Sequence, residues 1–166
     1  VLLLVLFAAL SLGLTHPGDH APDVTPAADA AAASPKSGDP WDVNVPHAPS
    51  DTLRFETTEG TWMTVDVSPD GRKILFDVLG DLYTMPMAGG RATRLTSGMA
   101  WDLQARWSPD GRKIAFTSDR GGTENAWMMN ADGTSPRPVS QEADRFSISP
   151  AWSPDGRWIV VRRRLT

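Results

Sequence analysis

The chain has 166 residues, of which 40% are hydrophobic and 22% charged, enough for one domain with appendages. Its net charge is −4, but from residue 51 onward 15 acidic and 15 basic side chains cancel. A neutral domain has no net electrostatic attraction to nucleic acid or to an anionic membrane, so we expect neither as a partner. The absence of cysteine excludes disulfides and thiolate chemistry in this chain.

Residues 1–14, VLLLVLFAALSLGL, are almost entirely apolar. This segment is short for a membrane span but suits the h-region of a secretory signal peptide. It has neither an initiator Met nor a basic n-region, so we predict a truncated signal, with a buried helix as the alternative. The prediction implies a periplasmic or secreted protein with no stable membrane span.

Residues 15–50 are rich in Ala, Pro and Asp and contain seven prolines. Such a composition cannot bury enough apolar surface to offset chain entropy, so we predict a mobile linker. His16 and His20 have the i, i+4 spacing of a helical metal pair. Pro17 and Gly18 lie between them and oppose a helix, which argues against a metal site there.

The phrase Ser-Pro-Asp-Gly-Arg occurs three times, starting at Ser68, Ser108 and Ser153. The starts lie 40 and 45 residues apart, a spacing typical of β-propeller blades. Pro sets φ for a tight turn and Gly supplies the left-handed residue that closes it. We therefore predict structural turn residues, without a catalytic role, at Asp70, Gly71, Asp110, Gly111, Asp155 and Gly156.

β-prone runs on both sides of these turns predict four strands in each of the first two units and two in the third. The predicted strands are residues 62–67, 73–78, 82–87, 92–96, 104–107, 113–118, 126–130, 137–140, 148–152 and 157–161. Residues 51–166 are thus predicted to be all-β, a partial propeller of about two and a half four-stranded blades. Because propellers close with about 4–8 blades, we expect a fragment of a longer protein.

Two resemblances extend this interpretation. Residues 107–122, WSPDGRKIAFTSDRGG, and 127–134, WMMNADGT, resemble the Pro-Asp, WD-like repeat of TolB-like β-propellers. Residues 59–63, 77–86 and 96–102 resemble the propeller that precedes a metal-dependent amidohydrolase domain in large exported bacterial proteins. Related propellers also precede serine peptidases and tricorn-like proteases, which remain alternatives.

The amidohydrolase resemblance implies a parent hydrolase that uses a divalent metal. It also implies that the partners of this segment are the remaining blades and a C-terminal domain of the same chain, or a separate protein. A Lewis-acid site needs His-rich ligands, but His16, His20 and His47 all precede the repeats and none forms His-x-His. Their position also leaves no His within the repeats for a Ser-His-Asp triad.

We therefore expect no catalytic residue, no cofactor and no metal site in this chain. The role that remains is substrate gating or protein interaction within an exported hydrolase. The alternative is a TolB-like interaction module of the periplasm and cell envelope.

In propellers that this chain resembles, ligands and partners meet loops around the central channel. By blade order, one face should carry the loops at residues 79–81, 97–103, 119–125 and 141–147. The candidate ligand or partner residues in these loops are Trp101, Asp102, Arg120, Glu124, Asp144, Arg145 and Phe146. The alternative is that these are ordinary loop residues, with Trp101 packed onto a blade.

Overall fold

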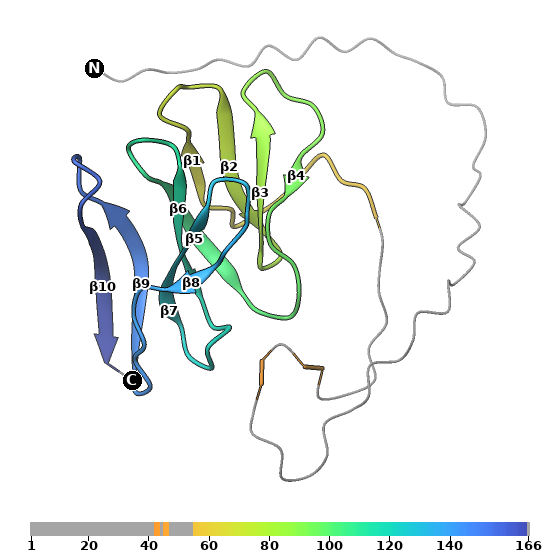
Figure 1. The fold of residues 1–166 in the computed structure, drawn as a ribbon. Helices are drawn as coiled ribbons and strands as arrows, with labels where there is room; N and C mark the ends of the chain where they lie inside the picture. The colour runs from red at the N-terminus through yellow and green to blue at the C-terminus, as the bar shows by residue number, and fades with distance from the viewer. Residues whose placement is uncertain (1–41, 44, 47–54, 166) are drawn as a thin grey trace. The chain divides into compact units, whose positions relative to one another are not determined.

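The computed structural model describes residues 42–43, 45–46 and 55–165. The predicted signal segment and most of the predicted linker lie outside these residues. All the regular elements in the described part are β-strands, which confirms the all-β fold (Figure 1). This part of the chain contains no helix that could span a membrane.

The strands form three antiparallel sheets, which correspond to two blades and part of a third. The first blade contains β1 (Val65–Val67), β2 (Lys73–Val78), β3 (Asp81–Pro86) and β4 (Thr93–Arg94). The second contains β5 (Asp102–Trp107), β6 (Lys113–Ser118), β7 (Asn125–Asn130) and β8 (Arg137–Pro138). The third sheet pairs β9 (Arg145–Trp152) with β10 (Ile159–Leu165). The predicted partial propeller is therefore confirmed.

The second strands of the first two blades, residues 73–78 and 113–118, agree with the sequence prediction. The first strand is shorter than predicted, because Trp62 has a φ of 60° and the strand begins only at Val65. The third sheet is longer than predicted at both strands. The second of these strands extends to Leu165 and so includes the arginines at 162–164.

Each Ser-Pro-Asp-Gly-Arg phrase forms the turn between the first and second strand of its sheet. In the second copy, Ser108 Oγ donates to Asp110 Oδ1 at 2.6 Å, and Asp110 Oδ1 accepts the Arg112 N–H at 3.0 Å. The other two copies repeat this pattern. Gly111 has a φ of 69°, and a Cβ built on it would lie 3.6 Å from Cδ of Pro69, so successive turns pack against one another.

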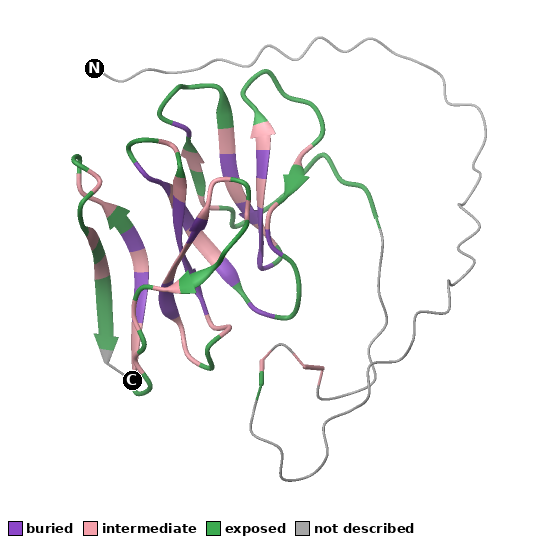
Figure 2. Cartoon of the chain, viewed as in Figure 1, coloured by how far each residue is buried: buried purple, intermediate pink, exposed green. Residues whose placement is uncertain are grey.

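The described hydrophobic core lies mainly between the first two blades (Figure 2). Its buried members are Leu75, Leu82, Ala105, Trp107, Ile114, Phe116 and Met129. Among the described residues, nothing equivalent covers the opposite side of the first blade. Val65 and Val67 are 51% and 45% exposed, whereas Ala105 and Trp107, at the same places in the next inner strand, are 3% and 7% exposed.

The inner strands β5 and β9 each contain a β-bulge whose residue has a positive φ: Gln104 at 56° and Ser149 at 55°. In both cases a side chain of the preceding blade accepts the N–H of the bulge residue. Asp77 Oδ2 accepts from Gln104 at 2.9 Å, and Gln104 Oε1 and Thr117 Oγ1 accept from Ser149 at 2.9 Å and 3.1 Å. These bonds tie each blade to the next where the inner strand departs from regular pairing.

Candidate functional site at the loop face

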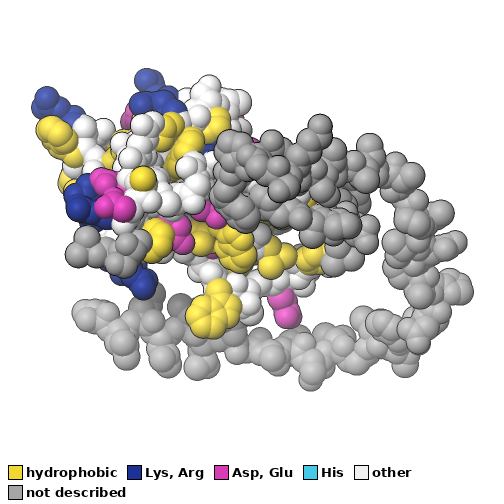
Figure 3. Space-filling view, turned by 90° about the horizontal axis from the view of Figure 1, so that it is seen from below, with side chains coloured by type: hydrophobic (Ala, Val, Ile, Leu, Met, Phe, Trp, Pro, Cys, Tyr) yellow, Lys and Arg dark blue, Asp and Glu magenta, His cyan; other side chains and the backbone are white. Residues whose placement is uncertain are grey.

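The predicted ligand loops lie at one end of the blades, which we call the loop face. It consists of the turns at residues 79–80 and 119–124 and the segments at 97–101 and 141–144. The two turns lie at the lower ends of their blades in Figure 1. Figure 3 views this end of the molecule and shows hydrophobic side chains among acidic and basic ones.

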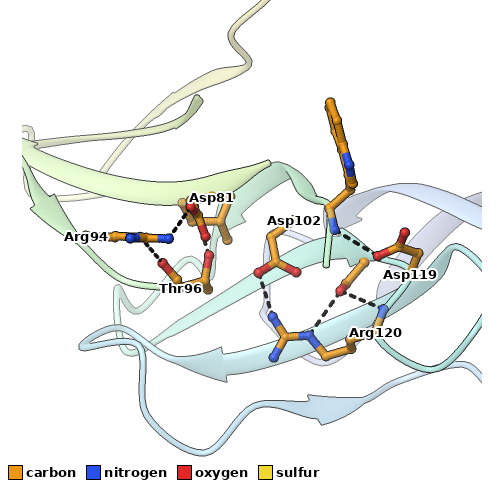
Figure 4. Close-up of polar contacts among 9 residues, drawn as sticks. Asp81, Arg94, Thr96, Asp102, Asp119 and Arg120 are labelled. Atoms are coloured by element: carbon orange, nitrogen blue, oxygen red, sulfur yellow. Dashed lines mark hydrogen bonds and ion pairs between the residues drawn. The ribbon is translucent and has the colours of Figure 1, made fainter. Parts of the chain in front are cut away.

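Two predicted site residues form a buried ion pair at this face. Asp102, which begins β5, is 1% exposed, and its Oδ2 accepts a hydrogen bond from Arg120 Nη2 at 2.6 Å (Figure 4). Arg120 Nε donates to Ser118 Oγ at 3.0 Å. The guanidinium carbon lies 5.3 Å from the ring centroids of both Phe116 and Trp127. A carboxylate, a hydroxyl and two aromatic rings therefore fix the Arg120 guanidinium, as cation–π contacts add to the ion pair.

A second ion pair, which the sequence reasoning missed, lies beside the first. Asp81 begins β3, and its Oδ2 lies 2.5 Å from Arg94 Nη2 (Figure 4). Burial raises the pKa of Asp81, while Arg94 opposes this shift and the nearby Asp102 adds to it. The available signal was the position of Asp81, the last residue of the predicted loop at 79–81.

Trp101 is held in place while most of its side chain stays open to solvent. Its backbone N–H donates to Asp119 Oδ1 at 2.8 Å, and the next N–H, of Asp102, donates to the Gly80 carbonyl at 2.8 Å. A Cβ built on Gly80 would lie 3.4 Å from the indole, so the ring lies against this turn of the first blade. Trp101 is nevertheless 58% exposed.

Two further exposed apolar side chains accompany Trp101 on the loop face. Leu79, in the turn before Gly80, is 76% exposed and has a φ of 52°. Met99, two residues before Trp101, is 50% exposed. Neither was among the sequence-predicted site residues, because exposure of an apolar side chain in a turn has no clear sequence signal. We call Leu79, Met99 and Trp101 the apolar patch.

The other predicted site residues gather at the start of β9. The Glu124 carbonyl accepts the N–H of Ser147 at 3.0 Å. Asp144 Oδ2 lies 3.8 Å from Arg145 Nε, and both side chains are exposed. Phe146 pairs with Arg164 across the β9–β10 ladder. The predicted residues thus fall into one group around β5 and another around β9.

The two hollows described here lie at the opposite end of the blades, near the Ser-Pro-Asp-Gly-Arg turns. One, of about 320 Å³, is lined by residues of all three inner strands and their turns, among them Asp66, Arg106, Trp107 and Trp152. The other, of about 340 Å³, lies between the second and third turns and includes Lys113. Neither hollow was predicted from the sequence.

Among the described residues, no group of three or more His, Cys, Asp or Glu side chains is arranged to hold a metal ion. His16, His20 and His47 lie outside the described residues. The expectation that this chain has no cofactor or metal site therefore stays a prediction.

Repeated four-stranded antiparallel sheets, joined by side-chain bonds at their inner strands, define the class as β-propeller. The chain belongs to the TolB beta propeller domain family, whose model matches residues 52–166. This result confirms the TolB-like resemblance.

Three individual proteins illustrate the similarity. The uncharacterised protein Atu1656 of Agrobacterium fabrum is 36% identical over 99 residues, which cover 56% of this chain and 33% of that protein. The uncharacterised peptidase YuxL of Bacillus subtilis is 38% identical over 74 residues, covering 43% and 11%. The crystal structure of TolB from Acinetobacter baumannii matches with a TM-score of 0.57 and 28% identity, covering 65% and 28%. The matches thus span a third or less of each of these proteins.

Proposed function

We propose that this chain is a non-catalytic propeller segment of an exported, amidohydrolase-like hydrolase, and that it gates substrate or binds protein through its loop face. The observation that carries the proposal is the exposed apolar patch, in which the Trp101 backbone is held by a hydrogen bond to Asp119. Aromatic and Met side chains are enriched at the cores of protein interfaces, and Trp is a frequent anchor there. The charged groups of the two ion pairs beside the patch are already paired with one another within the chain. We therefore expect the apolar side chains to supply the contact with a substrate or protein partner.

The assignment to an amidohydrolase-like parent rests on the sequence resemblance of residues 59–63, 77–86 and 96–102. In such a parent, the loop face would contact the catalytic domain or the substrate on its way to it. The divalent metal and its ligands would then belong to that other domain.

A second candidate is a TolB-like interaction module of the periplasm and cell envelope. The similarity to TolB from Acinetobacter baumannii favours it. A third candidate is the propeller of a serine peptidase or tricorn-like protease, which the similarity to a protein named as a peptidase favours. All three candidates share binding by a non-catalytic propeller and an exported location.

Photo-crosslinking at two matched methionines tests the proposal. Met99, in the apolar patch, and Met87, which follows β3 at the other end of the blade, are 50% and 45% exposed. We expect a photoreactive residue at 99, introduced in the protein expressed in its host, to give a defined product that Trp101→Ala removes. The same residue at 87 should not give this product.

The nature of the product distinguishes the candidates. A crosslink within one polypeptide supports the amidohydrolase-like parent if the crosslinked domain carries His-rich metal ligands, and the peptidase candidate if it does not. A crosslink to a separate envelope protein supports the TolB-like module. Identical products from positions 87 and 99, or a product unaffected by Trp101→Ala, would contradict binding through the loop face.

A further inference from the structure

Charge is unevenly distributed between the two ends of the blades. The loop face carries four acidic residues and one basic residue, which gives a net charge of −3. They are Asp119, Glu124, Glu142, Asp144 and Arg120. At the other end, the turn segments at 68–73, 108–113 and 153–158 carry three acidic and five basic residues, a net charge of +2. A cationic group is therefore attracted to the loop face rather than to the opposite end.

The apolar patch lies where the first two blades meet. Leu79 belongs to the turn between β2 and β3, and all four strands of both sheets are among the described residues. The Trp101 indole lies against the Gly80 turn, since a Cβ built on Gly80 would be 3.4 Å from it, yet Trp101 is 58% exposed. Part of the indole ring is thus open to a ligand.

A carboxylate without a cation lies beside this ring. Asp119 Oδ1 accepts the Trp101 N–H at 2.8 Å, and none of the ion pairs among the described residues includes Asp119. Only Cα and Cβ separate the Trp101 backbone nitrogen from its indole. A guanidinium paired with Asp119 can therefore also lie within about 6 Å of the ring centroid, the range of a cation–π contact.

The second blade shows such an arrangement with its cation in place. Arg120 pairs with Asp102 at 2.6 Å, and its guanidinium carbon lies 5.3 Å from the ring centroids of Phe116 and Trp127. A carboxylate and aromatic rings thus hold one guanidinium between them. Asp119 and Trp101 repeat the carboxylate and the ring, but no residue of the described part supplies the guanidinium.

We propose that the loop face binds a basic segment of a protein through one Arg side chain, whose guanidinium pairs with Asp119 and lies over the Trp101 indole. An apolar side chain next to that Arg contacts Leu79 and Met99. Arg fits better than Lys, because a planar guanidinium stacks on an aromatic ring and pairs with a carboxylate at the same time. The inference rests on the binding role proposed above for the loop face and specifies the chemistry of the partner.

Binding of labelled peptides to the 166-residue chain tests the proposal. The probe has an Arg between two Leu residues. The comparison peptide has citrulline in place of the Arg, which keeps the size of the side chain and removes its charge. We expect the Arg peptide to bind about tenfold more tightly, the ratio that one exposed ion pair and one cation–π contact produce together.

Two variants assign this preference to its residues. Asp119→Asn keeps an oxygen that can accept the Trp101 N–H and removes the charge, whereas Trp101→Leu keeps an apolar side chain and removes the ring. Each should reduce the preference for Arg over citrulline to about threefold, and the two together should remove it. Asp155→Asn, in the turn at the opposite end of the third sheet, changes the net charge equally and should preserve the preference.

The crosslinked product from position 99 provides a second test, in the protein that the host expresses. Mass spectrometry should locate the crosslink in a segment that contains an Arg, and Asp119→Asn should lower the yield of the product. A product that depends on Trp101 but whose segment has no Arg would support binding through the loop face and refute this inference.

Three results with the peptides would also overturn the inference. They are no binding of the Arg peptide at millimolar concentration, equal affinity of both peptides, and a preference that survives the combination of Asp119→Asn with Trp101→Leu. None of these results bears on whether position 99 gives a Trp101-dependent product, so failure of this inference is distinguished from failure of the proposed function.

Discussion

Asp77 in β2 of the first blade accepts a hydrogen bond from the backbone N–H of Gln104 in β5, the inner strand of the second blade. The distance from Asp77 Oδ2 to Gln104 N is 2.9 Å, and the other carboxylate oxygen accepts the Thr64 N–H at 3.0 Å. Gln104 has a positive φ, so the carboxylate holds a conformation that a non-glycine residue rarely adopts. The Asp77 carboxylate therefore binds the residue that precedes β1 in its own blade and the bulge of β5 in the next blade.

Asp77→Ala is expected to lower the free energy of unfolding by about 3 kcal/mol, because it leaves two N–H groups without their charged acceptor at a site that is 2% exposed. Urea unfolding of the variant and the parent measures this difference. Glu59→Ala, at an exposed acid, is the control and should change stability by less than about 0.5 kcal/mol. Equal stability of the two variants would contradict a role for Asp77 in joining the blades.

The two ion pairs of the loop face should differ strongly in energetic importance. Arg120→Ala leaves the carboxylate of Asp102, 1% exposed, without its cation and should cost about 3–5 kcal/mol. Arg94→Ala removes a partner that is 49% exposed and should cost no more than about 1 kcal/mol. Chemical unfolding of both variants tests this order. A larger loss of stability for Arg94→Ala would show that burial does not determine how much each ion pair contributes.

Asp110 should contribute stability that depends on pH. The hydrogen bond from Ser108 and the N–H of Arg112 lower the pKa of Asp110 in the folded chain. A lowered folded-state pKa means that the stabilisation is present above the unfolded value, about 3.9, and is lost as pH falls through the folded value. The Asp110→Asn variant should therefore lack this loss of stability at acidic pH. Thermal unfolding of both proteins between neutral and acidic pH measures the difference, and parallel curves would contradict the prediction.

Asp81 should show the opposite pH dependence. Because burial raises its folded-state pKa, the folded chain binds the proton more strongly than the unfolded chain does. Its favourable contribution is present below the unfolded pKa, about 3.9, and is lost as pH rises through the higher folded value. The parent should thus lose stability relative to Asp81→Asn over this range. Thermal unfolding against pH checks the sign, and a relative gain for the parent would refute it.

The repeated turns and strands could be predicted from the sequence because their causes are local. Pro and Gly at fixed places in each phrase impose turn geometry, and β-prone residues on both sides pair through that turn. The strands at 73–78 and 113–118 were predicted to the residue for this reason. Blade order also placed Trp101, Asp102 and Arg120 on one face before their contacts were known.

Tertiary structure decided what depends on residues distant in the sequence. The ion pair of Asp81 with Arg94 and the exposure of Leu79 depend on strand pairing and packing that the sequence pattern does not show. The sequence repeat indicates that the blade structure recurs. It does not indicate how each blade packs, because backbone pairing between strands tolerates many different side chains. Which side chain is buried, and which must find its partner elsewhere, depends on the neighbouring blade, so packing rather than periodicity determines the surfaces through which this propeller acts.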